Sequence, residues 1–198
     1  MLFPPVPHMD EAHVYTFQGV RYPNVTSILG AVGIVNYSAM PPALKEAAMK
    51  RGSFVHKACE LDDLGTLDES TLAEELRGYV EAWRAFRRFL TREGGEIIPE
   101  WTERKMVSIA LGYCGTMDRV VRQNGVDISL DIKTGKLMRW TGVQLAAYDL
   151  ARGECNRERW GVQLGKDGDF KRVIYTDNDD YATWLAALKV YKFSNKGE

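Results

Sequence analysis

Two aspartates and a lysine in the second half of the chain have residue types and a spacing suited to metal-assisted chemistry. Asp131 follows Asp118 by thirteen residues, and Lys133 follows Asp131 by two. Carboxylate oxygens are the ligands that Mg²⁺ and Mn²⁺ prefer. A bound cation of this kind generates hydroxide near neutral pH and offsets the negative charge that builds up on a phosphoryl group. If the three side chains meet in the folded chain, they can hydrolyse a phosphodiester, with the lysine orienting the attacking water.

A tight turn between the two aspartates predicts that they do meet. Asn124-Gly125 separates two runs of apolar, β-branched residues, which is the strongest short-range signal of a β-hairpin. A two-residue loop pairs Gln123 with Val126 and sets Asp118 opposite Asp131, with Cβ atoms about 4.5–5.5 Å apart. The lysine points to the same face, because side chains alternate along a strand. Two opposed carboxylates destabilise a hairpin unless positive charge lies between them, so this geometry predicts a cation site.

The other face of the hairpin supports the same register. It is expected to carry Arg119 as an exception among the apolar side chains of Met117, Val121, Ile128, Leu130 and Ile132. A shift of one residue would move the carboxylates into the core and these side chains into solvent. The alternative interpretation is a surface hairpin in which the lysine simply forms ion pairs with the acids, since an Asp-x-Lys triplet is common.

Composition indicates an ordinary globular chain of one domain, 1–198. The length suffices for a full hydrophobic core, and no apolar run approaches the roughly 18 residues that span a membrane. The N-terminus lacks the pattern of a secretory signal and the three cysteines form no CxxC pair, so a reduced cytoplasmic setting is expected. The net charge of −1 argues against coating of nucleic acid by bulk electrostatics but allows a local basic groove.

The predicted elements give an α/β class with a mixed sheet and an N-terminal helical cap. Residues 1–40 are expected to be irregular, apart from a hairpin over 15–22 and a short helix capped by Asn24 or Thr26. Residues 41–94 form the cap, with helices over about 41–64 and over 67–92, the second capped by Asp68 or Ser70. The α/β core, 95–198, is expected to contain strands over 96–109, 113–123, 126–134, 159–164 and 170–175, and helices over 137–152 and about 178–193.

Five short segments follow one another in an order typical of one nuclease superfamily. They are Arg51 to Glu60, which holds an RG-x-x-x-H segment, Glu103 to Ser108, Gly112 to Asp118, Leu130 to Lys136, and Gln144 to Tyr148. Over about residues 50–150 this series resembles the RecB-type branch of the PD-(D/E)XK nuclease superfamily. The resemblance implies a restriction-endonuclease-like mixed β-sheet flanked by helices. It also implies a metal-dependent deoxyribonuclease, with exonucleolytic processing of DNA ends as the preferred activity.

The resemblance assigns roles to individual residues. It implies that the metal ligands are Asp118, Asp131, His56, Glu103 and the backbone carbonyl of Ile132, and that the cation is Mg²⁺ or Mn²⁺. It implies that catalysis depends on Lys133 together with Asp118, Asp131 and Glu103. Taken by itself, a histidine such as His56 is more often packed or part of a helix cap than a metal ligand, and the resemblance reverses this in favour of a site role.

Four further residues are expected to contact DNA. Gln144 and Tyr148 match the family's Q-x-x-x-Y motif and share one helix face, since residues four apart stack. Lys136 and Arg139 directly follow the predicted catalytic strand, which favours contact with a phosphate. The chain has no helicase motif or P-loop, so it is similar to stand-alone nucleases of phages or mobile elements, with a recombination or replication protein as a partner.

Two features depart from the family pattern. Met117 stands where the superfamily's name has a proline, although the RecB-type branch carries G-x-x-D at this place. Some relatives hold an iron–sulfur cluster on four cysteines, and the three cysteines of this chain lie at unrelated spacings, so no cluster is expected.

Other interpretations stay open beside the exonuclease. The same fold could carry a structure- or sequence-specific endonuclease, or a non-catalytic DNA-binding or assembly module. A stripe of Arg84, Arg87, Arg88 and Arg92 on the second long helix has a solvated face as its default interpretation and a phosphate-binding ridge as its alternative.

Overall fold

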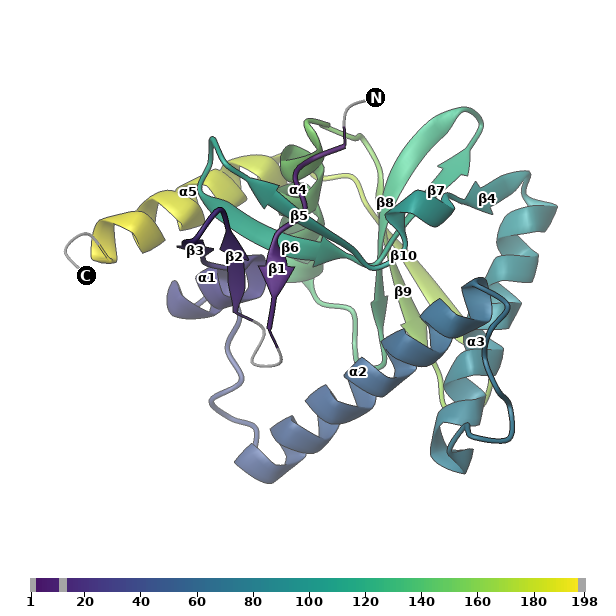
Figure 1. The fold of residues 1–198 in the computed structure, drawn as a ribbon. Helices are drawn as coiled ribbons and strands as arrows, with labels where there is room; N and C mark the ends of the chain where they lie inside the picture. The colour runs from purple at the N-terminus through teal and green to yellow at the C-terminus, as the bar shows by residue number, and fades with distance from the viewer. Residues whose placement is uncertain (1–2, 11–13, 196–198) are drawn as a thin grey trace.

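A five-stranded mixed sheet forms the centre of the protein in a computed structural model that describes residues 3–10 and 14–195 (Figure 1). Its strands run in the order β10 (Phe170–Tyr175), β9 (Arg159–Leu164), β8 (Val126–Lys133), β7 (Arg119–Gln123) and β4 (Gly95–Ile97). β8 and β9 are parallel, whereas the other neighbouring pairs are antiparallel. The α/β class and the mixed sheet are therefore confirmed.

Two smaller sheets lie beside the main one. β5 (Arg104–Ser108) pairs with β6 (Tyr113–Met117), and three short strands pair in the order β1 (His8–Met9), β2 (Tyr15–Phe17) and β3 (Val20–Tyr22). The hairpin predicted over 15–22 is confirmed, and both of its turn residues, Gln18 and Gly19, have positive φ.

Helices cover both faces of the main sheet. The described helices are α1 (Val25–Ala31), α2 (Pro42–Asp63), α3 (Glu74–Arg92), the 3₁₀ helix η1 (Pro99–Trp101), α4 (Arg139–Arg152) and α5 (Asp179–Ser194). On one face, Trp83 and Phe86 of α3 share a core with Ile132 of β8. On the other, α1, α4 and α5 form a second core with β6 and with Val120 of β7. Within the described ranges, every helix is too short or too polar to cross a bilayer.

The hairpin that carries the aspartates has the predicted register. Asn124 and Gly125 have φ values of 52° and 75°, as a two-residue type I′ turn requires. β7 then pairs with β8 from Gln123–Val126 to Arg119–Leu130. The hairpin does not lie at the surface, because β8 lies between β7 and β9 and most of its residues are buried. The ion pair between Lys133 and Asp131 that the alternative interpretation expected is present.

The strand predicted over 113–123 is in fact two strands that meet at Asp118. β6 ends at Met117 and β7 begins at Arg119, and the two strands belong to different sheets. Met117 therefore packs in the core beside α4 and α5, and not with Val121 on the face where the sequence placed it. This change of sheet is the feature of the fold that positions the candidate site.

Two other predicted boundaries are wrong for identifiable reasons. The strand over 96–109 breaks into β4, η1 and β5, because Pro99 has no backbone N–H and starts a helical turn. The helix predicted from Leu67 begins at Glu74. The Asp68 carboxylate accepts a hydrogen bond from the backbone N–H of Ser70 at 2.9 Å and closes a separate turn before that helix.

Most remaining boundaries agree with the sequence. α2, β9 and β10 occupy the predicted ranges within one or two residues. Asn24 is the N-cap of α1, because its Oδ1 accepts a hydrogen bond from the Ser27 N–H at 2.8 Å. Gly153 ends α4 in the left-handed conformation.

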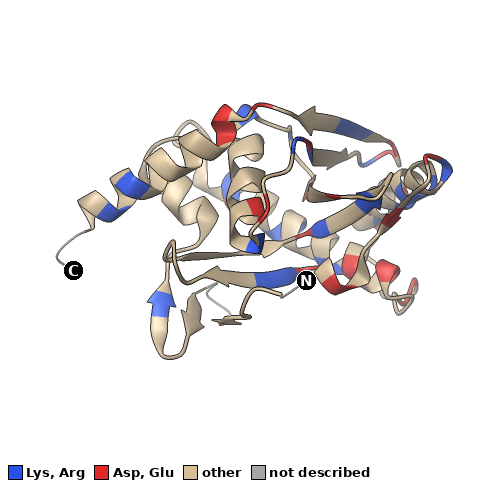
Figure 2. Ribbon diagram, turned by 90° about the horizontal axis from the view of Figure 1, so that it is seen from above, with Lys and Arg blue, Asp and Glu red and all other residues tan. Residues whose placement is uncertain are grey.

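Charged residues of both signs are interspersed over α2 and α3 (Figure 2). The charged residues in the C-terminal half of α5 are both basic, Lys189 and Lys192. With a formal net charge of −1 for the whole chain, any basic binding surface has to be local.

Candidate metal centre

Beyond the point where β7 ends, side chains form the hydrogen bonds to one edge of β8. The last paired residues are Arg119 and Leu130, so β7 offers no backbone partner to Ile132. The Ile132 N–H donates instead to Asp118 Oδ2 at 2.7 Å, and the Ile132 carbonyl accepts from His56 Nε2 at 3.0 Å. Because buried backbone polar groups are almost always paired, these two hydrogen bonds hold Asp118 and His56 against the edge of β8.

Three side chains that can ligate a metal converge at this edge. His56 comes from the middle of α2, Asp118 from the junction of β6 and β7, and Glu103 from the residue before β5. His56 Nδ1 lies 3.3 Å from Glu103 Oε1 and 3.6 Å from Asp118 Oδ1. One ligand atom from each of the three residues lies within 4.8 Å of the others.

Glu103, one of these three residues, has a strained backbone conformation. Its φ is 46°, and its N–H donates to the Asp118 carbonyl at 2.9 Å. A left-handed conformation is uncommon for glutamate and persists only where surrounding contacts enforce it. The Glu103 carboxylate is therefore held at the site by its backbone as well as by its side-chain partners.

The imidazole balances the charge of the two carboxylates. Burial by itself lowers the pKa of His56, but the Asp118 and Glu103 carboxylates outweigh burial and raise this pKa to about 9. Burial raises the pKa of Asp118 to about 7; attraction to His56 opposes the rise, and repulsion from Asp131 and Glu103 adds to it. At neutral pH a proton on His56 thus provides the positive charge that the cluster requires.

Arg119 anchors Glu103 from inside the protein. It is fully buried, and it donates from Nε to Asp63 Oδ2 at 2.7 Å and from Nη1 to Glu103 Oε1 at 3.0 Å. Burial opposes ionisation of Glu103, but His56 and Arg119 lower the pKa of that carboxyl. The sequence marked Arg119 only as an exception on an apolar face. An arginine on an apolar face was the signal in the sequence that could have indicated these acidic partners, because a buried arginine requires them.

Asp131 and Lys133 form a second group beside the cluster. Lys133 Nζ lies 2.8 Å from each carboxylate oxygen of Asp131. Asp131 is 1% exposed, so this ion pair is buried on the carboxylate side. Burial by itself lowers the pKa of Lys133, but Asp131 and Asp118 raise it, so the side chain stays an ammonium. The predicted ladder pair between the two aspartates does not form, because the chain leaves the sheet at Asp118.

Gln144 and Tyr148 lie behind Asp131 and not at the surface. They are 4% and 6% exposed. Gln144 Nε2 donates to Asp131 Oδ1 at 3.0 Å and to Tyr148 Oη at 3.0 Å, and Lys133 Nζ lies 3.4 Å from Gln144 Oε1. Their geometry is that of residues that orient the Asp131–Lys133 pair, and their contact with DNA stays a prediction.

Lys136 and Arg139 are the two exposed members of the predicted DNA-contact set. Lys136 lies in the loop after β8, and Arg139 begins α4. The Arg139 side chain is 87% exposed and reaches Asp177 at 3.4 Å. Both cations are accessible to a phosphate group, and their contact with DNA stays a prediction.

Gly115, in β6, packs directly against the ring of Tyr148. A Cβ at this position would lie 2.5 Å from Tyr148 Cε1. We expect Gly115→Ala to displace the ring, weaken its hydrogen bond with Gln144 and destabilise the protein by about 1–3 kcal/mol. Chemical denaturation measures the effect, with Gly30→Ala in α1 as the control because a Cβ there meets nothing within 4 Å. Equal stability of the two variants would contradict this packing.

Proton release should accompany cation binding at this centre. We expect Mn²⁺ to displace about one proton at pH 8 and about two at pH 6, because His56 (pKa about 9) is protonated at both and Asp118 (pKa about 7) only at the lower pH. Affinity for Mn²⁺ should therefore rise about tenfold per pH unit between pH 7 and 9, and more steeply below pH 7. Calorimetry in two buffers of different ionisation enthalpy counts the protons, and a count near zero at pH 8 would exclude His56 as a ligand.

Comparison of the sequence with protein-family models gives no match, and comparison with curated proteins gives none either. The family resemblance of the sequence therefore stays a prediction. The case for a function rests on the geometry of the centre itself.

Proposed function

We propose that the protein is a divalent-metal-dependent deoxyribonuclease that processes DNA ends exonucleolytically. The observation that carries this proposal is the convergence of His56, Glu103, Asp118 and the Ile132 carbonyl at one edge of β8, beside the Asp131–Lys133 pair. The ligand atoms are oxygens and one imidazole nitrogen, a set compatible with Mg²⁺ or Mn²⁺. The mixed sheet with helices on both faces supports a restriction-endonuclease-like architecture.

The donor set fits a divalent cation in two respects. Asp131 is a buried carboxylate paired with Lys133 and Gln144, and an ionised carboxylate has further lone pairs that a metal ion could share. Burial, with repulsion from Asp131 and Glu103 as a smaller contribution, also raises the pKa of Asp118, and a bound cation would favour its ionised form. The cation would be held by Asp118, Asp131, Glu103, His56 and the carbonyl of Ile132. When bound, it would make a water more acidic and stabilise negative charge on a phosphoryl group.

Lys133 provides a fixed positive charge beside this centre. Its side chain is 24% exposed, and in this proposal a phosphodiester and a water approach it from the exposed side. Asp131 and Gln144 hold it from the protein side. The ammonium can then orient the attacking water or stabilise the charge that develops on the phosphate oxygens.

Two exposed basic residues next to the centre are proposed to bind the DNA substrate. Lys136 and Arg139 follow β8 directly and would bind backbone phosphates on either side of the bond that is cut. Contacts of this type position the strand without reading its sequence. The proposed protein partner is a recombination or replication protein.

One assay tests the proposed activity. Purified protein is incubated with end-labelled linear DNA and with covalently closed circular DNA, in Mg²⁺, in Mn²⁺ and in EDTA. We expect the linear DNA to be degraded from its ends only with a metal, while the circle stays intact. Cleavage of the circle would support the endonuclease alternative. Binding of DNA without cleavage in either metal would favour a non-catalytic module and would refute the proposal.

A further inference from the structure

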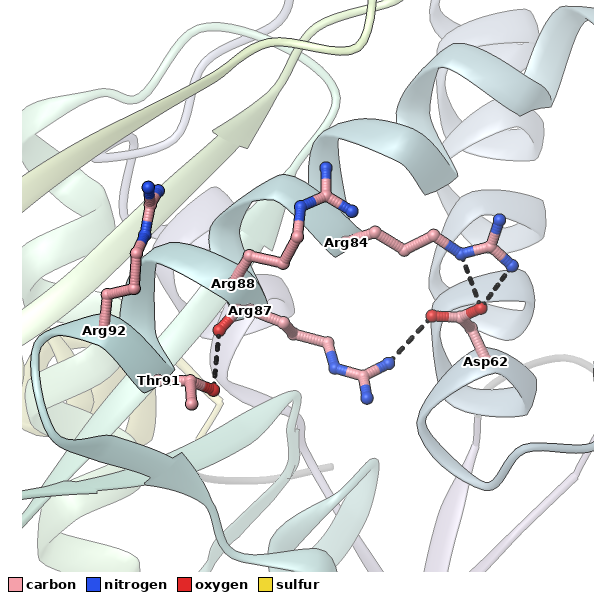
Figure 3. A pocket seen from close by; sticks show the side chains of 6 residues that line it. All are labelled: Asp62, Arg84, Arg87, Arg88, Thr91 and Arg92. Carbon is pink, nitrogen blue, oxygen red and sulfur yellow. Dashed lines mark hydrogen bonds and ion pairs between the residues drawn. The ribbon is translucent and has the colours of Figure 1, made fainter.

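A cavity lined mainly by arginines opens between the C-terminal end of α2 and the second half of α3 (Figure 3). Its volume is about 770 Å³. The lining residues are Asp62, Arg84, Arg87, Arg88, Thr91 and Arg92. Of these six, four carry positive charge and one carries negative charge, so the cavity is suited to an anion.

Two of the arginines are held in place by a shared carboxylate. Arg84 Nε donates to Asp62 Oδ1 at 2.8 Å, and Arg87 Nη1 donates to Asp62 Oδ2 at 2.8 Å. Arg84 also contacts Glu69 and Glu81 outside the cavity. The charge of Arg84 is thus largely offset, and both guanidinium groups are fixed in orientation.

Arg88 and Arg92, unlike Arg84 and Arg87, have no acidic partner in the cavity. Neither forms an ion pair within the described part of the chain, and Figure 3 shows both side chains without a bonded partner. They follow Arg84 at intervals of four residues, so the three lie along one face of α3. Like charges at this spacing destabilise a helix. A bound anion would relieve that repulsion and would find two guanidinium groups able to bind it.

The cavity continues toward the metal centre. A second cavity of about 230 Å³ shares two lining residues with the first and reaches Thr102, the residue before Glu103. Asp63 also lines this second cavity, and it accepts the hydrogen bond from Arg119, which in turn holds Glu103. The second cavity thus extends from the arginines to the residue that precedes Glu103 in the chain, and its charged lining residues are Arg87, Asp63 and Glu96.

We propose that the larger cavity is an arginine groove that binds successive backbone phosphates of a nucleic-acid strand whose scissile phosphate lies at the metal centre. This inference rests on the proposed function, which identifies the phosphate ligand as a nucleic acid. Arginine binds phosphate through paired N–H donors. The six residues that line the larger cavity include no aromatic side chain, so the contact is to the backbone and independent of sequence.

A charge-reversal pair tests the groove. We expect Arg88→Glu/Arg92→Glu to bind a labelled single-stranded oligonucleotide at least tenfold more weakly than wild type in EDTA, where no cleavage occurs. The slope of log affinity against log salt should fall by about 1.4, since each phosphate contact on a single strand contributes about 0.7. Fluorescence anisotropy over a salt series measures both quantities. Arg88→Lys/Arg92→Lys keeps the charge and should retain most of the affinity, and circular dichroism checks that each variant is folded.

The matched control reverses two lysines on α5. Lys189→Glu/Lys192→Glu changes the net charge by the same amount, at the far side of the molecule from α3 (Figure 1). It should bind the oligonucleotide within about twofold of wild type, because screening limits charge effects to about 10 Å at moderate salt. If the arginine pair and the lysine pair lost the same affinity for the oligonucleotide, the effect would be one of net charge alone, and the inference would be overturned.

The remaining outcomes separate this inference from the proposed function. If wild type cleaves DNA and Arg88→Glu/Arg92→Glu binds with unchanged affinity and slope, the groove is wrong and the nuclease stands. If wild type binds labelled inorganic polyphosphate but not the oligonucleotide, the phosphate comes from another source and the strand assignment is overturned. If wild type neither binds nor cleaves DNA, both proposals fall.

Discussion

Asp131→Asn is expected to lower metal-dependent DNA cleavage by at least about 10³-fold, which corresponds to about 4 kcal/mol of transition-state stabilisation. Asparagine keeps the shape of the side chain and its hydrogen bond with Gln144, so the fold should be retained. What it removes is the negative charge that pairs with Lys133 and that we assign to the metal ion as well. Initial rates on end-labelled DNA and the affinity for Mn²⁺ measure the two consequences.

Two further variants make this result specific. Asp127→Asn removes a carboxylate from the same strand, but one that pairs with the half-exposed Arg122, and it should leave cleavage unchanged. Lys133→Met keeps every proposed ligand, so it should lose cleavage while still binding Mn²⁺. Wild-type cleavage by Asp131→Asn would show that the reaction centre lies elsewhere.

Arg119→Met is expected to destabilise the protein by up to about 3–5 kcal/mol, because it removes the fully buried cation that Asp63 and Glu103 share and leaves them only the more distant Arg87 and His56. The Asp63 side chain is 8% exposed and that of Glu103 is 21% exposed, so water cannot fully replace the lost partner. The pKa of Asp63 is already raised by burial against the pull of Arg119, and it should rise further in the variant. Urea denaturation at neutral pH measures the loss of stability.

The surface of the same strand offers a matched control for Arg119. Arg122 forms an ion pair with Asp127 at 2.7 Å, but its side chain is 47% exposed. Arg122→Met should therefore cost less than about 1 kcal/mol. The double variant Arg119→Met/Asp63→Asn should recover part of the loss, since it removes one of the two stranded charges. Similar losses for Arg119→Met and Arg122→Met would contradict a buried anchoring role.

The elements that follow from local sequence were predicted correctly. Asn124-Gly125 adopts the positive φ values of a tight turn and sets the register of β7 on β8, as neighbouring residues alone require. Asn24 caps α1 through a contact three residues away. Alternating or continuous apolar runs likewise predicted β9 and β10. In each case the residues that decide the structure lie within one turn or one hairpin of each other.

The position of Asp118 could not be predicted in this way. An apolar run over 113–123 favours one strand, and nothing within it signals that the chain changes sheets at the aspartate. The change arises because β6 pairs with β5 while β7 pairs with β4 and β8. Those pairings depend on segments distant in sequence, and they decide that Asp118 bonds the edge of β8 and does not pair across from Asp131.

By itself the sequence determined the residue types of the centre and the strand that carries Asp131 and Lys133. Tertiary structure decided which donor atoms meet: His56 and Glu103 are 47 residues apart along the chain, and Arg119 reaches Asp63 across 56 residues. It also decided that Gln144 and Tyr148 are buried supports of Asp131. The physical reason is that turn conformation, helix capping and side-chain alternation depend on near neighbours in sequence, whereas burial, charge pairing and side-chain hydrogen bonds act between whatever surfaces the packed helices and sheets bring together.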